Sequence, residues 1–176
     1  MGLKGGPTQD EVMAVSLAKL GIHPGDRVVD VGCGTGKVAI AASRLAERVY
    51  AIDRRAEAIA YARAQAAAAG ASNVEFFEGD AVEILPDLGP LDAAFVGGSR
   101  RLPEVLDLLA GTVQGRIVVN AVMIGTLQSA VATMQRLGIF VEAVHLQVSR
   151  SADIAGGTMF KPVNPVYVIV GGAGCS

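Results

Sequence analysis

The chain has 176 residues and a mass of 18.0 kDa, which is enough for one domain of ordinary size with a buried core. Apolar residues make up 51% of the chain and charged residues 18%, a composition that excludes an intrinsically disordered protein. The formal net charge is −2 and the pI is near 5.7, so there is no overall basic field to attract nucleic acid. We therefore expect a single domain over residues 1–176 and no nucleic-acid partner.

The sequence contains no signal for export or membrane insertion. Its first residues lack the apolar region of a signal peptide, and the longest apolar run, 117–125, is interrupted by Asn120 and is too short to cross a bilayer. Two cysteines, Cys33 and Cys175, are too few for a disulfide framework and are expected to be reduced thiols. These features predict a cytoplasmic protein without a membrane partner.

The predicted elements begin with a helix and then alternate. The first helix starts at a capping box formed by Thr8 and Glu11 and ends at Gly21, and a buried strand follows at 27–31. Further helices are expected at 37–46, 56–69, 81–85, 103–110 and 126–137, and further strands at 48–52, 74–78, 92–96, 116–120, 140–148 and 165–170.

This alternation predicts an α/β fold of the Rossmann-like type, in which helices cover both faces of a seven-stranded, mostly parallel sheet. No helix separates the last two strands, which are joined by the glycine-containing stretch 150–164. The last strand is therefore expected to be antiparallel to its neighbours.

A glycine-rich loop follows the first strand. Gly32, Gly34 and Gly36 stand at alternate positions between the end of that strand and the start of the next helix. Glycines there let the backbone turn sharply and let a ligand lie directly against it. Because ligands of open α/β sheets bind at the carboxyl ends of the strands, the loop predicts a binding site.

Three kinds of nucleotide loop can be compared with this one. A P-loop needs four residues between its first Gly and the Gly-Lys pair, but only three lie between Gly32 and Gly36. The dinucleotide fingerprint would place its third glycine at the position of Lys37. The observed spacing, with Asp30 two residues before the first glycine, is similar to that of S-adenosylmethionine-dependent methyltransferases of the Rossmann-like class. A tight strand-to-helix turn without a ligand remains the alternative.

Two more acids fall at strand ends. Asp53 closes the second strand, where a carboxylate can accept hydrogen bonds from both hydroxyls of a ribose. Asp80 follows the third strand and can accept from an adenine amino group, while the backbone N–H of Ala81 can meet a ring nitrogen. Each acid alone could instead be a solvated residue at a helix N-terminus. Together the strand ends predict an S-adenosylmethionine site formed by Asp30, Gly32, Cys33, Gly34, Thr35, Gly36, Asp53, Asp80, Ala81 and Gly97.

The end of the fourth strand carries no device for gripping an amine. Methyltransferases that act on exocyclic amines of bases usually have an Asn/Asp-Pro-Pro-aromatic tetrad there, whereas this chain has Gly97, Gly98 and Ser99. The similar run at 164–167 opens the last strand and is interpreted as structural. A glycine floor suits a broad, flat substrate that lies close to the backbone.

With these residues in view, the chain resembles the decarboxylating precorrin methyltransferases of cobalamin biosynthesis, which occur as separate proteins or as the C-terminal half of a fused enzyme. The resemblance covers essentially the whole sequence and rests on the segments 6–8, 11–12, 30–36, 49–54, 78–81, 96–99, 157–159 and 164–166. The glycine loop is shared by many methyltransferases. The Gly-Pro-Thr opening, the Gly-Gly-Ser loop and the Gly-Thr-Met segment are much narrower marks.

The resemblance implies an activity, a cofactor and an assembly. The family methylates carbon 15 of a precorrin, with or without cobalt, and removes carbon dioxide from the acetate on ring C. Thr8, Gly32 to Gly36, Asp53 and Ala81 match its positions for S-adenosylmethionine. The resemblance also implies a homotetramer and a fused or separate partner methyltransferase for carbon 5.

The substrate implied by this resemblance is an anionic tetrapyrrole, whose carboxylates would be met by arginine or lysine. The predicted substrate-binding residues are Gly98, Ser99, Arg100, Arg101, Arg150 and Lys161; any of these cations could instead be an ordinary surface residue. No catalytic acid, base or metal ligand can be named. Two other functions stay open: a methyltransferase for RNA or protein, and a non-catalytic nucleotide-binding module.

Overall fold

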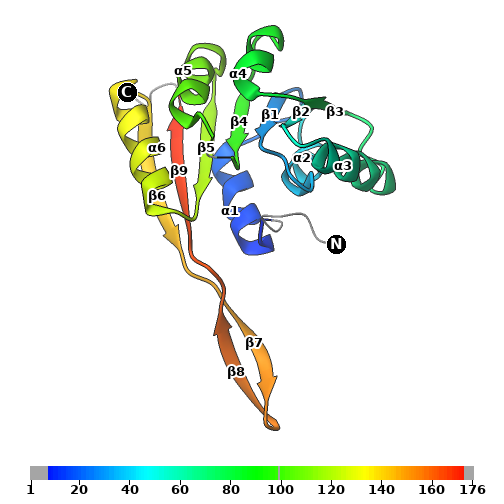
Figure 1. Cartoon of the computed structure of the whole chain (residues 1–176), viewed down its shortest axis with the longest axis vertical. Helices are drawn as coiled ribbons and strands as arrows, with labels where there is room; N and C mark the ends of the chain where they lie inside the picture. The colour runs from blue at the N-terminus through cyan, green and yellow to red at the C-terminus, as the bar shows by residue number, and fades with distance from the viewer. Residues whose placement is uncertain (1–7, 99, 173–176) are drawn as a thin grey trace.

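The computed structural model describes residues 8–98 and 100–172. Seven strands form one sheet in the order β3-β2-β1-β4-β5-β9-β6, and two more form a separate hairpin (Figure 1). The sheet contains β1 (Arg27–Val31), β2 (Arg48–Asp53), β3 (Val74–Glu78), β4 (Ala93–Val96), β5 (Arg116–Ala121), β6 (Phe140–Leu146) and β9 (Val166–Gly172). Strands β1 to β5 are parallel to one another, and β9 is antiparallel to both of its neighbours, β5 and β6. The expected fold class is confirmed.

Helices cover both faces of the sheet because the buried strand residues alternate between two apolar clusters. In β4, for example, Ala94 and Val96 belong to one cluster, whereas Ala93 and Phe95 belong to the other. The first cluster is covered by α4 (Ala81–Ile84), α5 (Leu102–Thr112) and α6 (Ile124–Arg136), and the second by α1 (Asp10–Leu20), α2 (Lys37–Ala42) and α3 (Ala56–Ala68). A short 3-10 helix, η1 (Leu85–Asp87), follows α4.

The predicted capping box at the first helix is wrong. Gln9 is the N-cap residue of α1, and no side chain caps the helix there. Glu11 instead forms an ion pair with Arg150, and the backbone carbonyl of Thr8 accepts a hydrogen bond from Lys37. Both residues of the predicted box thus interact with distant parts of the chain instead of capping the helix.

The stretch 150–164, expected only as a connection, contains a β-hairpin formed by β7 (Ser149–Ile154) and β8 (Gly157–Pro162). Ala155 and Gly156 form its two-residue turn, both with positive φ. The hairpin follows β6, which runs in the same direction as β5. It therefore extends from the end of the sheet that holds the carboxyl ends of the parallel strands (Figure 1). Its side chains are mostly exposed, so the apolar alternation that predicts a strand is missing.

Candidate functional site

The glycine-rich loop after β1 is held between two other segments. Gly32 has a φ of 78°, and a Cβ there would lie 2.7 Å from the backbone nitrogen of Gly98 in the loop after β4. Gly36 has a φ of 76°, and a Cβ there would lie 2.8 Å from the Cβ of Ala62 on α3. Any side chain at either position would push these segments apart, so the two glycines are needed for close packing as well as for the backbone turn.

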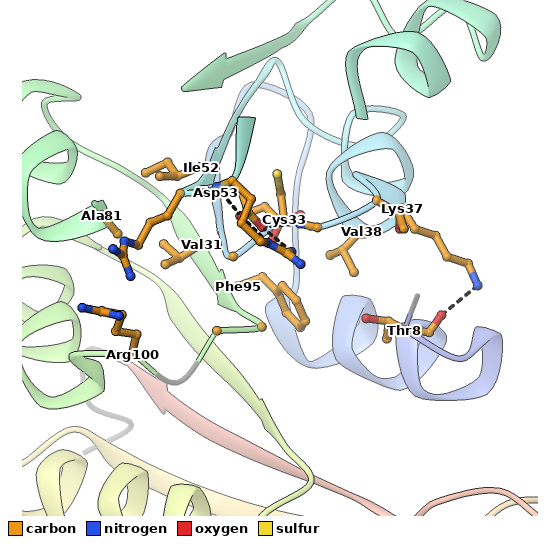
Figure 2. A pocket seen from close by; sticks show the side chains of 18 of the residues that line it. Thr8, Val31, Cys33, Lys37, Val38, Ile52, Asp53, Ala81, Phe95 and Arg100 are labelled. Atoms are coloured by element: carbon orange, nitrogen blue, oxygen red, sulfur yellow. Dashed lines mark hydrogen bonds and ion pairs between the residues drawn. The ribbon is translucent and has the colours of Figure 1, made fainter. Parts of the chain in front are cut away.

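A cavity of about 430 Å³ opens beside this loop, at the carboxyl ends of the first four strands (Figure 2). It receives most of the residues predicted from the sequence: Thr8, Asp30, Gly32, Cys33, Gly34, Thr35, Asp53, Asp80, Ala81, Gly97, Gly98 and Arg100. The cavity therefore brings together side chains and backbone from four strand ends and from the segment before α1, which is the arrangement that the strand-end argument predicts.

Asp30 is a buried acid in the wall of this cavity. Its side chain is 1% exposed, and neither carboxylate oxygen has a hydrogen-bond partner among the described residues. Burial raises the pKa of Asp30 to about 7; the backbone N–H of Ala39 opposes this rise, and the negative charge of Asp53 adds to it. A buried carboxylate without a partner is costly, so this position favours a ligand that brings a hydrogen-bond donor or a positive charge.

Asp53, at the end of β2, is the second acid in the cavity. Its Oδ2 accepts a hydrogen bond of 2.9 Å from the backbone N–H of Gly34, which fixes the carboxylate against the glycine loop. Burial acts to raise the pKa of Asp53, but hydrogen bonds from Arg55 and from the Gly34 amide outweigh it, so the pKa lies below its ordinary value. Asp53 is therefore an ionised acceptor at neutral pH.

Asp80, the third acid, caps α4 and faces two arginines. It accepts a hydrogen bond from the backbone N–H of Val82, and its Oδ2 lies 3.6 Å from Arg101 and 3.9 Å from Arg54. That backbone hydrogen bond first, and the two positive charges next, hold the pKa of Asp80 below its usual range. Arg100 also lines the cavity, on the same side as Ala81, the residue that follows Asp80 (Figure 2).

The model of the precorrin methyltransferase domain family matches residues 4–171 of this chain. The chain belongs to the precorrin methyltransferase family. A relative from Methanosarcina acetivorans, named as a probable cobalt-precorrin-6B C(15)-methyltransferase (decarboxylating), is 48% identical over 176 residues, covering 97% of this chain and 96% of the relative. The family resemblance expected from the sequence is confirmed.

Solved structures agree with this membership of the precorrin methyltransferase family. The precorrin 8W decarboxylase of Methanobacterium thermoautotrophicum is 37% identical with a TM-score of 0.92, covering 96% of this chain and 92% of its own. A precorrin-6y C5,15-methyltransferase from Geobacter metallireducens is 32% identical, also with a TM-score of 0.92, covering 98% of this chain and 94% of its own.

Several predicted site residues lie outside the cavity of this precorrin methyltransferase. Gly36 packs against α3, and Arg101 does not line the cavity but pairs with Asp80 and with Glu104. Arg150 forms two hydrogen bonds with Glu11 on α1, and Lys161 lies opposite Arg150 in the hairpin. Neither hairpin residue lines this cavity, and their assignment to the substrate stays a prediction. Ser99 lies outside the described residues.

The sequence interpretation also missed part of the cavity lining. The additional residues are Val31, Lys37, Val38, Ile52, Arg54, Arg55, Gly79 and Phe95. Most of them are next in sequence to a predicted residue. Their position beside a strand end is therefore the feature of the sequence that could have identified them. The Nζ of Lys37 donates to the backbone carbonyl of Thr8, before α1, at 2.8 Å (Figure 2), and pairs with Asp10, the first residue of α1, at 2.7 Å.

The thiol of Cys33 is buried, and burial raises its pKa, so the structure provides no activated thiolate at the loop. His145 stacks on Tyr167 with ring centroids 4.5 Å apart, in keeping with a structural role.

Within residues 8–98 and 100–172, no helix is long and apolar enough to cross a membrane. The same residues include no group of three or more His, Cys, Asp or Glu side chains arranged to hold a metal ion.

Proposed function

We propose that this chain methylates carbon 15 of precorrin-6B or cobalt-precorrin-6B with S-adenosylmethionine and removes carbon dioxide from the ring C acetate, in cobalamin biosynthesis. The observation that carries the proposal is the cavity in which Asp30, Asp53 and Asp80 end or follow three strands beside the glycine loop. The names of the relatives point to the same reaction.

The residues of the cavity fit the parts of S-adenosylmethionine. The buried, unpartnered carboxylate of Asp30 suits the ammonium group of the methionine moiety. Asp53 suits the ribose hydroxyls, and Asp80 with the N–H of Ala81 suits the adenine. When bound, S-adenosylmethionine supplies an activated methyl group. Thr8 and the backbone of Gly32, Cys33, Gly34, Thr35 and Gly97 complete the proposed site, and Gly36 shapes its loop.

The surface beside the cavity suits an anionic tetrapyrrole. Arg54 and Arg100 line one end of the cavity, and Arg101 pairs with Asp80 there; we call these three residues the arginine rim. Such cations can meet the carboxylates at the edge of the macrocycle. Gly98 and Ser99 remain the proposed floor.

An apolar segment leaves the neighbouring strand. Val96, the last residue of β4, is level with Val119 of β5, and β5 continues to Ala121, so the segments after these two parallel strands leave the same end of the sheet. Val122 and Met123, which follow β5, and Ile124, the first residue of α6, are 61%, 66% and 63% exposed; we call these three residues the apolar loop. Consecutive exposed apolar side chains next to a binding site favour contact with an apolar ligand face, here that of the macrocycle.

The reaction requires positioning more than acid–base chemistry. The nucleophilic carbon, the methyl group and the sulfur must lie in line, and the cavity and its rim would hold the two substrates for that approach. Methylation of carbon 15 leaves a cationic ring system, which can accept the electron pair released when the neighbouring acetate loses carbon dioxide. One binding site thus serves both steps, and no side chain of this chain is assigned as a base.

We also propose the assembly, location and domain organisation expected from the sequence. Strands from both halves of the chain share one sheet, which supports a single domain over 1–176. Ile154 and Phe160 of the hairpin are 55% and 69% exposed. Since an isolated two-stranded hairpin is marginally stable, these exposed apolar side chains support burial of the hairpin between subunits of a homotetramer. A cytoplasmic location and a partner methyltransferase for carbon 5 stay predictions.

The test is an incubation of the protein with methyl-labelled S-adenosylmethionine and either cobalt-precorrin-6B or precorrin-6B. We expect label at carbon 15 of the macrocycle and release of one carbon dioxide for each methyl group transferred. Label appearing only in added RNA or protein would contradict the proposal and support the alternative substrates. An absence of S-adenosylmethionine binding by calorimetry would contradict both.

A further inference from the structure

All acceptor positions of Asp53 are occupied within the protein. Its Oδ1 accepts from the backbone N–H and from Nε of Arg55, both at 3.0 Å. Its Oδ2 accepts from the backbone N–H of Gly34 at 2.9 Å and from Nη2 of Arg55 at 3.0 Å. A carboxylate has about four lone-pair sites, so four donors saturate it. A ribose can therefore bind Asp53 only if some of these donors leave.

The donors that can leave are those of the Arg55 side chain. The N–H groups of Gly34 and Arg55 belong to the backbone of the glycine loop and of the N-cap of α3, so moving them would disturb both elements. The guanidinium can move by a change of side-chain rotamer that leaves the backbone in place, and the Arg55 side chain is 39% exposed. Its Nε and Nη2 donate side by side to the two oxygens, as the two hydroxyls of a ribose would.

We propose that the Arg55 guanidinium fills the ribose position at Asp53 when no nucleoside is bound and is displaced by the ribose hydroxyls, so that Arg55 competes with S-adenosylmethionine. This inference rests on the assignment of Asp53 to the ribose. Glu57, in the first turn of α3, interacts electrostatically with Arg55 and offers a negative charge near which the displaced guanidinium can remain.

The competition has a measurable size. A ligand that must displace a side chain binds with an affinity reduced by the fraction of molecules in which that side chain has moved. Asp53 is 6% exposed but the Arg55 side chain is 39% exposed, and for such a partly exposed ion pair we expect a reduction of about two- to fivefold in affinity. Since salt weakens ion pairs that solvent reaches, the affinity of the wild-type protein should increase at higher ionic strength.

The experiment is calorimetric titration of S-adenosylmethionine and S-adenosylhomocysteine into the wild-type protein, Arg55→Ala and Arg55→Lys, at low and high salt. We expect Arg55→Ala to bind both ligands about two- to fivefold more tightly than wild type, with a smaller salt dependence. Arg55→Lys, which keeps the charge without the paired donors, should fall between them. Arg44→Ala is the matched control, because it removes one exposed arginine outside the cavity.

The second arm places Arg55→Ala in an Asp53→Ala background, where the gain in affinity should disappear because the competed carboxylate is gone. Weaker binding by Arg55→Ala than by wild type would overturn the inference and make Arg55 a direct ligand contact. A gain that persists without Asp53 would overturn it as well. Wild-type protein that binds neither ligand would instead overturn the proposed function on which the inference rests.

Discussion

At the scale of single residues, Asp30 is proposed to bind the ligand, but its buried charge lowers the stability of the folded protein. A carboxylate buried without a described partner destabilises the folded chain whenever it is charged. Its pKa of about 7 lies above the value of 3.8 expected for an unfolded chain, so the folded state binds the proton more tightly. The stability contributed by this residue therefore falls as the pH rises from about 4 to about 7.

This linkage predicts the behaviour of Asp30→Asn. At pH 8 the variant should have a free energy of unfolding roughly 1–3 kcal/mol above wild type, because it has no buried charge. Near pH 4 the difference should nearly vanish, because Asp30 is then neutral in the folded protein. Urea denaturation at the two pH values measures it. An equal difference at both would show that burial of charge at Asp30 is not the cause.

Asp53→Ala gives a second prediction at this scale. The variant should bind S-adenosylmethionine about 1–3 kcal/mol more weakly in calorimetric titration, because it loses charged hydrogen bonds to the ribose. Asp87→Ala is the control, since Asp87 is an exposed acid in η1 outside the cavity. An unchanged affinity in Asp53→Ala would contradict the assignment of the ribose.

At the scale of elements, the sequence predicted the strands and helices that alternate along the chain. It did not predict features that depend on contacts between residues far apart in the sequence. The alternation of apolar runs and glycines indicated the sheet and the strand ends, because buried parallel strands are apolar on both faces. The capping box failed because Glu11 pairs with Arg150, 139 residues away. The cavity lining was predicted where a residue lies at a strand end. Arg55 was missed because its role depends on the rotamer that meets Asp53.

The hairpin leads to a prediction about assembly. Ile154 and Phe160 are exposed on a two-stranded element that stands away from the sheet (Figure 1). The double variant Ile154→Ser, Phe160→Ser should lower the molar mass measured by light scattering, while its S-adenosylmethionine affinity stays close to that of wild type. The conservative pair Ile154→Val, Phe160→Leu should keep the mass. If the serine variant keeps it too, these side chains do not hold the assembly together.

At the scale of the whole molecule, the sheet places the two proposed ligands on different parts of one edge. Asp30 and Asp53, in β1 and β2, are buried in the wall of the cavity, whereas Arg100 and the apolar loop follow β4 and β5, the next two strands of the sheet. The strand order produces this separation, because β2 and β3 lie on one side of β1 whereas β4 and β5 lie on the other. Changes to Arg100 or to the apolar loop should therefore affect the tetrapyrrole without affecting S-adenosylmethionine.

Arg100→Ala and Met123→Ser test this separation in a steady-state assay with cobalt-precorrin-6B. Removing a charged contact to a substrate carboxylate should raise KM for the tetrapyrrole about tenfold, the scale of a lost charged hydrogen bond. Exposing a polar group to the macrocycle face should raise it by a smaller factor. The dissociation constant of S-adenosylmethionine should stay within about twofold of wild type in both variants, because neither side chain is assigned to its binding. A loss of S-adenosylmethionine affinity, or a change in molar mass on Met123→Ser, would instead place these residues in the cofactor site or between subunits.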